Sequence, residues 1–186
     1  MRAFIAIEIS EEARAALAAL QEALRPVGAD VGWTRPESLH LTLRFLGEID
    51  ERQAGAVAAA MREVARAWPP LALRLSGTGA FPNARRPRIL WAGLDGELER
   101  LAGLQAAIEA RLVGLGFARE EKPFHPHLTL GRIKTERRTR ELLAEAARHP
   151  LPAPTWTGAE IVLMQSELLR TGARYSVVAH APLRCV

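Results

Sequence analysis

The tetrapeptide His-Leu-Thr-Leu occurs twice in this chain, at residues 40–43 and again at residues 127–130. Each copy offers one imidazole and one hydroxyl. The imidazole of histidine has an ordinary pKa of about 6.5, so it can accept or donate a proton at neutral pH. One such peptide can arise by accident, but two identical copies are far less expected. The doubling therefore suggests two equivalent lobes that face a shared cleft.

Two imidazoles in one cleft can divide the work of breaking a phosphodiester bond. Water must lose a proton as it attacks, and the departing alkoxide must gain one. A neutral histidine can act as the base and a protonated histidine as the acid. Threonine hydroxyls can donate to the non-bridging oxygens, where negative charge accumulates. A single copy can also be interpreted as a buried histidine hydrogen-bonded to a neighbouring threonine in a sheet; the second copy favours the chemical interpretation.

Alternation along a strand predicts how the first copy is oriented. Residues two apart point to the same side of a sheet, so we expect His40, Thr42 and Arg44 on one face. The leucines lie on the other face and anchor the strand in its core. Arg44 is therefore a candidate ligand for a phosphate group, and the same position is equally typical of a solvated arginine at the edge of a groove.

In the second copy, the same alternation places His127 and Thr129 on one face. Arg132 follows at the opposite parity, so it can reach a phosphate only if the chain turns at Gly131. Sites carried by strands hold their geometry better than sites on loops, so we expect these side chains to be held rigidly.

Helix signals occur at four places. Ser10, Asp50, Asp95 and Thr135 each precede apolar residues at helical spacing, and Gln53 completes a capping box with Asp50. Helices and strands alternate without a regular strand–helix–strand rhythm, which predicts an α+β fold with antiparallel sheets and two packed lobes. The expected strands are near residues 3–9, 39–46, 71–75, 89–92, 124–131, 159–165 and 174–180.

The composition indicates a basic globular protein. The 186 residues carry a net charge of +4, and arginine supplies all but two of the 25 basic residues. Codon bias in a GC-rich genome can explain the arginines, while the basic balance favours a polyanionic substrate. The basic stretches at 85–88 and 132–140 are either solvated faces or contacts for upstream phosphates of a nucleic acid.

Cysteine usage and hydropathy indicate where the protein works. The single cysteine, Cys185, cannot form an internal disulfide, which favours a reducing compartment. No apolar run approaches the ~20 residues that span a membrane. We therefore expect a cytoplasmic protein with no membrane association.

These motifs resemble the 2H phosphoesterases, whose mark is a pair of His-x-Thr-x motifs. The chain is most similar to the bacterial and archaeal RNA 2′,3′-cyclic phosphodiesterases, once called 2′-5′ RNA ligases. The resemblance implies a single bilobal domain over residues 1–186, with an antiparallel sheet backed by helices in each lobe and the active-site cleft between them. The segments that carry the resemblance are 2–7, 33–47 and 124–132.

The resemblance also implies an activity. Members hydrolyse a terminal RNA 2′,3′-cyclic phosphate to a 2′-phosphate without metal or other cofactor. It implies that His40 donates a proton to the departing 3′ oxygen, that His127 accepts a proton from water, and that Thr42 and Thr129 assist. The expected partner is an RNA 3′ end or a short oligonucleotide, and the expected state is a monomer.

Substrate-binding residues are predicted outside the two motifs. Arg132 agrees with the family pattern for holding the phosphate, and Arg44 is the second candidate. Aromatic residues at a cleft can stack on a terminal base. Trp33, just before the first motif strand, is the main candidate for this role, followed by Phe45.

Several alternatives remain open at the level of the sequence. His40, His125 and His127 could instead be three ligands of a zinc hydrolase, although no acidic residue stands beside either motif to join them. The same two proton transfers in the reverse direction would make the protein a 2′-5′ RNA ligase. Another alternative among enzymes is action on a small cyclic nucleotide. A protein that binds RNA ends without catalysis is the alternative outside enzymes.

Overall fold

The computed structural model describes residues 1–152, 154–170 and 172–184, so Cys185 lies outside the described residues. Within them the strands form two antiparallel sheets, one of four strands in the order β3-β1-β8-β9 and one of five in the order β2-β6-β5-β4-β7. The strands are β1 Arg2–Glu8, β2 Val31–Trp33, β3 His40–Glu48, β4 Leu71–Phe81, β5 Ile89–Gly96, β6 His127–Ile133, β7 Trp156–Gly158, β8 Glu160–Leu169 and β9 Gly172–Pro182.

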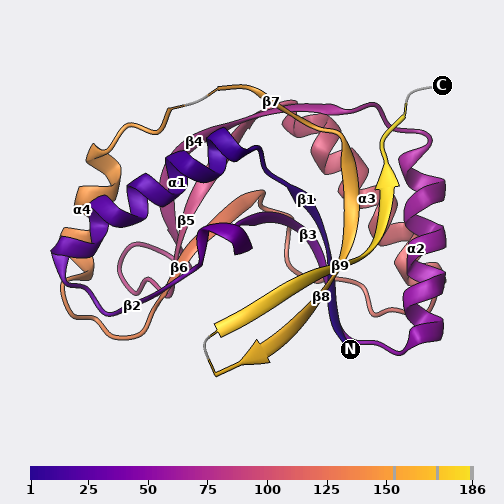
Figure 1. The fold of residues 1–186 in the computed structure, drawn as a ribbon, viewed down its shortest axis with the longest axis horizontal. Helices are drawn as coiled ribbons and strands as arrows, with labels where there is room; N and C mark the ends of the chain where they lie inside the picture. The colour runs from indigo at the N-terminus through magenta and orange to yellow at the C-terminus, as the bar shows by residue number, and fades with distance from the viewer. Residues whose placement is uncertain (153, 171, 185–186) are drawn as a thin grey trace.

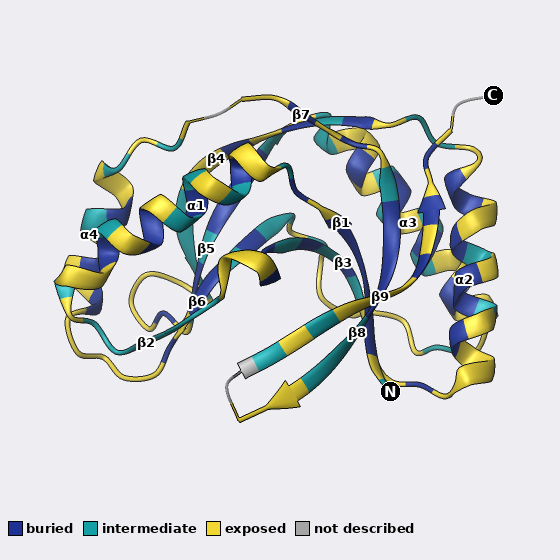
Figure 2. Ribbon diagram, in the orientation of Figure 1, coloured by how far each residue is buried: buried dark blue, intermediate teal, exposed yellow. Residues whose placement is uncertain are grey.

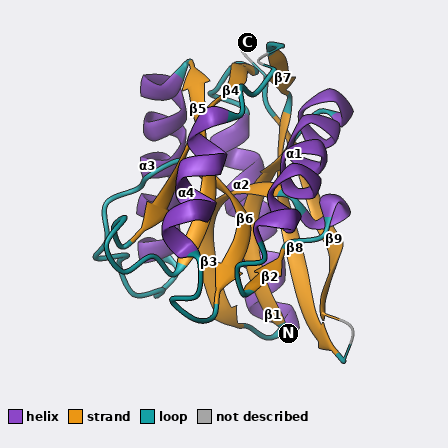
Figure 3. Ribbon diagram, turned by 90° about the vertical axis from the view of Figure 1, so that its left-hand side faces the viewer, coloured by secondary structure: helices purple, strands orange, loops and turns teal. Residues whose placement is uncertain are grey.

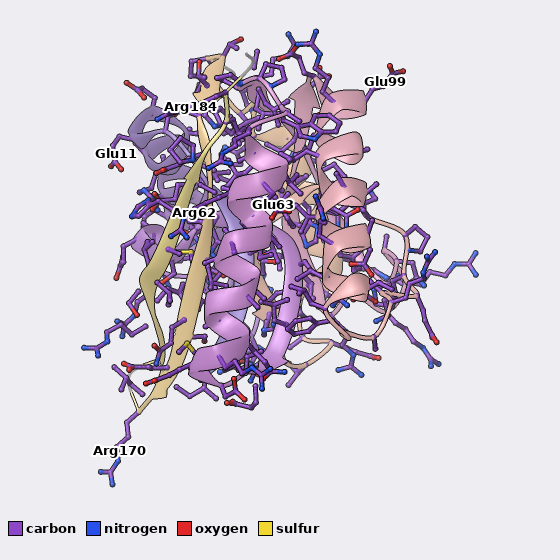
Figure 4. All side chains as sticks on the ribbon, turned by 90° about the vertical axis from the view of Figure 1, so that its right-hand side faces the viewer. Glu11, Arg62, Glu63, Glu99, Arg170 and Arg184 are labelled. Carbon is purple, nitrogen blue, oxygen red and sulfur yellow. The ribbon has the colours of Figure 1, made fainter. Side chains whose placement is uncertain are left out.

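Two helices back each sheet, as Figure 1 shows. Helices α1 and α4 cover the five-stranded sheet, and they stand in front of it in Figure 3. Helices α2 and α3 cover the four-stranded sheet, and Figure 4 shows Arg62 and Glu63 on the outer surface of α2. The helices are α1 Glu11–Leu24, α2 Glu51–Ala65, α3 Leu98–Gly114 and α4 Thr139–Arg148. None of the described helices has the length and apolarity that crossing a membrane requires.

The predicted α+β architecture with two antiparallel lobes is confirmed. The lobes do not correspond to the two halves of the sequence. Strand β1 belongs to the four-stranded sheet, but the helix that follows it packs on the other lobe, and β3 then returns to the first sheet. One continuous core of buried apolar residues joins both lobes, drawn in dark blue in Figure 2.

Two of the predicted helix starts are confirmed and two are wrong. Asp50 and Gln53 form the reciprocal capping box, and the Ser10 hydroxyl accepts from the Ala13 amide. Helix α3 begins later than predicted, because Glu97 and not Asp95 stands at its N-cap. Helix α4 likewise begins at Thr139 instead of Thr135, after a residue in left-handed conformation.

The motif leucines anchor the strands as predicted, because all four are buried in the shared core: Leu41, Leu43, Leu128 and Leu130. Alternation breaks at the last leucine of each copy. Thr42 pairs with Ala6 and Arg44 pairs with Ile5, so Leu43 has no partner on β1. Each extra residue of this kind is a β-bulge, which reverses the facing of the residues that follow it.

The same break occurs in the second copy. Thr129 pairs with Trp91 and Gly131 pairs with Leu90, which leaves Leu130 as the unpaired residue. On β5, Trp91 and Ile89 are two residues apart and share a face, while their partners on β6, Thr129 and Arg132, are three apart. Directly opposed side chains lie on the same side of a sheet, so the bulge brings Arg132 to the face of Thr129.

Candidate active site

The two motif strands meet at one cavity between the lobes. The cavity has a volume of about 570 Å³ and is lined by both histidines and both threonines of the motifs, which are His40, Thr42, His127 and Thr129. Strand β3 comes from the four-stranded sheet and β6 from the five-stranded sheet, and these strands lie beside each other in Figure 1. The tertiary fold thus brings together two motifs that lie far apart in the sequence.

Both imidazoles are held by the same local hydrogen bond. The Nδ1 atom of His40 lies 2.7 Å from the carbonyl oxygen of Ser38, and that of His127 lies 2.6 Å from the carbonyl oxygen of His125. A carbonyl oxygen only accepts, so in each ring Nδ1 carries the hydrogen and donates it. When such a ring is neutral, its Nε2 atom bears the free lone pair and is the position available for proton exchange.

His40 lies in an aromatic setting that the sequence did not indicate. The ring of Phe4 stacks on it at a centroid distance of 4.6 Å, and the ring of Tyr175 meets it edge-on at 5.1 Å. The pKa of His40 is lowered to about 4, mainly by burial among these side chains; the hydrogen bond to Ser38 opposes this shift, and the charges of Arg14 and His127 add to it. His40 is therefore neutral at pH 7 in the free protein.

His127 occupies the corresponding position in the other lobe. The ring of Phe81 meets it edge-on at 4.8 Å, and the ring of His125 lies 6.2 Å away. Burial lowers the pKa of His127 below its ordinary value; the hydrogen bond to the His125 carbonyl opposes this shift, and the electrostatic effect of the His125 ring adds to it. Both imidazoles are thus biased toward their neutral forms in the absence of an anion.

Arg132 reaches the cavity because of the bulge at Leu130. Its side chain is exposed, and it lines the same cavity as His127 and Thr129. The sequence predicted that Arg132 could reach a phosphate only if the chain turned near Gly131. The bulge at Leu130, immediately before that glycine, supplies this turn. The guanidinium of Arg132 forms no ion pair within residues 1–152, 154–170 and 172–184.

Arg44 does not share the face of Thr42, and this prediction is wrong. The bulge at Leu43 turns Arg44 toward helix α3, where its Nε atom lies 2.7 Å from Glu109. A second nitrogen of the guanidinium lies 3.6 Å from Glu120, and a third donates to the carbonyl of Ala118. These partners hold the guanidinium against α3, and Arg44 lines a second cavity instead of the one shared by the two motif histidines.

The same bulge turns Phe45 to the cleft instead. Phe45 pairs with Phe4 on β1, its side chain is 58 % exposed, and it lines the cavity. Trp33, by contrast, is not among the cavity-lining residues. It packs against the core, and the guanidinium of Arg25 lies 5.6 Å from its ring. The structure therefore brings Phe45, and not Trp33, to the site.

A second cavity of about 640 Å³ opens beside the first. Thr42, Phe45, Ile89 and His127 line both cavities, so the two are continuous at the motif side chains. The walls of the second cavity carry further aromatic rings and prolines, and its rim carries basic residues. These residues are Phe81, Pro82, Arg88, Lys122, Pro123 and Phe124, and the ion-paired Arg44 and Glu120 also line this cavity.

Residues beside the catalytic candidates escaped the sequence analysis. Phe4 and Tyr175 flank His40, but they come from β1 and β9, and nothing in their local sequence indicates which strand they neighbour. Strand β1 is buried continuously from Ala3 to Ile7, so no alternation in its sequence singles out Phe4. The described residues contain no group of three or more His, Cys, Asp or Glu side chains arranged to hold a metal ion.

Known proteins share both the sequence pattern and the fold. A family model described as LigT like phosphoesterase matches residues 7–91 and 93–175. The RNA 2′,3′-cyclic phosphodiesterase of Methanothermobacter thermautotrophicus is 33 % identical over 95 % of both chains. The protein of the same name from Thermus thermophilus is 38 % identical over 99 % of this chain and 91 % of its own length.

Solved structures share the fold of this chain. The crystal structure of TT0787 from Thermus thermophilus superposes with a TM-score of 0.81 at 33 % identity, covering 100 % of this chain and 99 % of that one. The apo form of LigT from E. coli shares the fold with a TM-score of 0.76, over 97 % of this chain and 96 % of its own. With the doubled motif on strands β3 and β6 and a family match over nearly the whole chain, this protein belongs to the LigT-like phosphoesterases of the 2H group.

Proposed function

We propose that this protein hydrolyses a terminal RNA 2′,3′-cyclic phosphate to a 2′-phosphate, with His40 and His127 as the acid–base pair and without a metal ion. One observation supports this above all: both His-Leu-Thr-Leu motifs line a single cavity, and each imidazole is anchored through Nδ1. The curated relatives described above carry the name of this activity. Two anchored rings that line one cavity suit an in-line displacement at one phosphorus atom.

The reaction requires two proton transfers. Water attacks the phosphorus, and the bond from phosphorus to the 3′ oxygen breaks. The proton lost by water passes to the neutral imidazole of His127, and the imidazolium of His40 donates a proton to the departing 3′ oxygen. The product keeps its phosphate on the 2′ oxygen. The hydroxyls of Thr42 and Thr129 donate to the non-bridging oxygens, where charge develops.

Arg132 complements this arrangement. Its guanidinium lies at the cavity with no competing carboxylate among the described residues, and a planar fork can bind two phosphate oxygens at once. The substrate's negative charge raises the pKa of both imidazoles, which offsets the effect of burial. A donor role for His40, whose pKa is about 4 in the empty cleft, depends on this shift.

The second cavity suits the remainder of the substrate. Its aromatic walls can stack on a nucleobase, and the side chains of Arg88 and Lys122 form no ion pair within the described residues. Phe45 stands at the junction of the two cavities, so we assign the stacking role to Phe45 in place of Trp33.

The decisive experiment uses a short RNA that ends in a 2′,3′-cyclic phosphate, incubated with pure protein and EDTA. We expect a 2′-phosphate product, identified by ³¹P NMR and by its resistance to enzymes that act on 3′-phosphates. His40→Ala and His127→Ala should each lower kcat by roughly a hundred- to ten-thousandfold while the protein stays folded. Activity that vanishes with EDTA and returns with zinc would contradict the proposal.

Other products would indicate other functions. Joined RNA from a 5′-hydroxyl partner would indicate the reverse, ligase reaction. Tight binding of the RNA end with no turnover would indicate a non-catalytic binding module. Equal turnover of a mononucleotide 2′,3′-cyclic phosphate and of the oligonucleotide would indicate that the physiological substrate is a small cyclic nucleotide.

The division of labour between the two histidines needs its own test. A substrate with sulfur in place of the 3′ oxygen has a leaving group that needs no protonation. If His40 is the proton donor, His40→Ala should recover most of its lost rate on this substrate, while His127→Ala should not. Recovery by His127→Ala alone would reverse the two roles.

A further inference from the structure

The two bulges of the motif strands occupy equivalent positions. Leu43 and Leu130 are each the third residue after the motif histidine, and each lacks a partner in the neighbouring strand. In both copies the bulge brings the fifth residue after the histidine to the cleft, and these residues are Phe45 and Arg132. A bulge disrupts the regular ladder locally, so side-chain donors to the carbonyl oxygen of a bulged residue can fix its position.

The carbonyl oxygen of Leu130 receives a side-chain donor from helix α1. The Nε2 atom of Gln21 donates to this oxygen at 2.9 Å and to the carbonyl oxygen of Thr34 at 2.7 Å. The amide of Thr34 also donates to Leu130 at 2.9 Å. Both hydrogens of the Gln21 amide are therefore used, and they join the bulge to the segment that leads into the first motif.

Gln21 is an unusual residue for its position. Its side chain is 2 % exposed, and it lies on the helix face formed by Leu17 and Leu24. A buried amide costs free energy unless it is hydrogen-bonded, and a leucine would fill the same stripe without that cost. The two carbonyl oxygens that it binds supply a reason for a polar residue here.

The other bulge shows the same arrangement. The Nε2 atom of Gln105, on helix α3, lies 3.4 Å from the carbonyl oxygen of Leu43. Gln105 is half-buried and lines the second cavity. This contact is longer than the bond made by Gln21, so we expect it to be the weaker of the two.

We propose that Gln21 and Gln105 are positioning residues, each of which holds the bulge of one motif strand and thereby keeps Arg132 or Phe45 on the cleft side. Neither glutamine side chain takes part in the chemistry. Gln21 acts through the bulge at Leu130 on Arg132, and Gln105 acts through the bulge at Leu43 on Phe45. This inference rests on the proposed function, because it assigns the two positioned side chains to the substrate.

The test compares each glutamine variant in two backgrounds. Gln21→Leu should lower kcat/KM on the cyclic-phosphate RNA by roughly ten- to a hundredfold, the usual effect of removing a group that orients an active-site residue. In an Arg132→Ala background the same change should cost about twofold or less, because the residue that it positions is already gone. In a Phe45→Ala background it should keep its full effect.

Gln105→Leu provides the matched experiment. We expect a smaller loss, about three- to tenfold, that disappears in the Phe45→Ala background and persists in the Arg132→Ala background. Residues that only stabilise the fold would lower activity by the same factor in every background. Equal factors in all backgrounds, or full activity of Gln21→Leu in the wild-type background, would overturn the proposal.

Two further measurements separate folding from function. Thermal unfolding of each variant shows whether it is folded at the assay temperature. If Gln21→Leu is unfolded, Gln21→Met replaces it, because methionine keeps the side-chain length without the hydrogen-bond donor. If the wild-type protein does not hydrolyse the RNA, the proposed function fails. The affinity for inorganic phosphate then supplies the readout, and Gln21→Leu should weaken it in the wild-type background but not in Arg132→Ala. An equal weakening in both backgrounds, or none in either, would reject the positioning role.

Discussion

The ring of Phe4 stacks on the imidazole of His40, with centroids 4.6 Å apart and an angle of 26° between the planes. Burial of the imidazole is the main cause of its low pKa of about 4. In an NMR titration we therefore expect the ring protons of His40 to shift near pH 4, well below an exposed histidine. Phe4→Ala should raise this midpoint toward 6.5, because water then reaches the ring. A wild-type midpoint near 6.5 would contradict this account of the site.

The same pKa makes stability depend on pH. The pKa of His40 is about 4 in the folded protein and about 6.5 in the unfolded chain, so between these values the unfolded chain binds more protons. The free energy of unfolding should therefore fall as the pH is lowered from 6.5 to about 4. Urea unfolding of the wild type and of His40→Asn across this range measures the effect, and the decline should be shallower in the variant. Parallel curves would show that His40 contributes nothing to it.

Arg132 should matter for the substrate and little for the fold. Its exposed guanidinium lies at the cavity, so Arg132→Ala should lower kcat/KM by roughly ten- to a thousandfold and leave the thermal midpoint nearly unchanged. Arg132→Lys should recover only part of the loss, because an ammonium group cannot bind two phosphate oxygens as a planar fork does. Full activity of Arg132→Ala would exclude it from phosphate binding.

Arg44 should show the opposite behaviour. Its side chain and that of Glu109 are 11 % and 16 % exposed, and removal of one partner leaves a largely buried charge unpaired. We expect Arg44→Ala to reduce the free energy of unfolding by about 2 to 4 kcal/mol. The double variant Arg44→Met with Glu109→Leu should recover part of this stability. A loss of substrate affinity with no loss of stability in Arg44→Ala would restore the phosphate role predicted from alternation.

Gly79 should not tolerate a side chain. A Cβ atom at this position would lie 2.3 Å from the ring of Trp91, whereas one at Gly77 on the same strand would meet nothing within 4 Å. Gly79→Ala must displace the indole, which should cost about 1 to 3 kcal/mol, and Gly77→Ala serves as the matched control. Trp91 pairs with Thr129 on β6, so activity should fall as well. Equal stability of the two variants would contradict the packing described.

Local chemistry was sufficient for much of the molecule. The doubled motif predicted that both histidines line one cleft, and the capping box at Asp50 predicted the start of α2, because each motif is a pattern of residues close together in the chain. The motif leucines were predicted to be buried for the same reason. Alternation is a property of one strand, and it held for the first four residues of each copy.

Only the tertiary structure decided how the side chains beyond each motif are oriented. A bulge depends on how a strand pairs with its neighbour. Gly131 follows the bulge at Leu130, but no glycine or proline adjoins the bulge at Leu43. Alternation, when extended past the bulge, therefore placed Arg44 on the cleft side, where the structure has Phe45. The carboxylate partner of Arg44 is Glu109, which lies 65 residues away on α3. The amino-acid sequence by itself determined the two imidazoles, the two hydroxyls and the class of fold. The three-dimensional pairing of strands determined which arginine and which aromatic ring accompany them, because side-chain facing is set by contacts between segments distant in the chain.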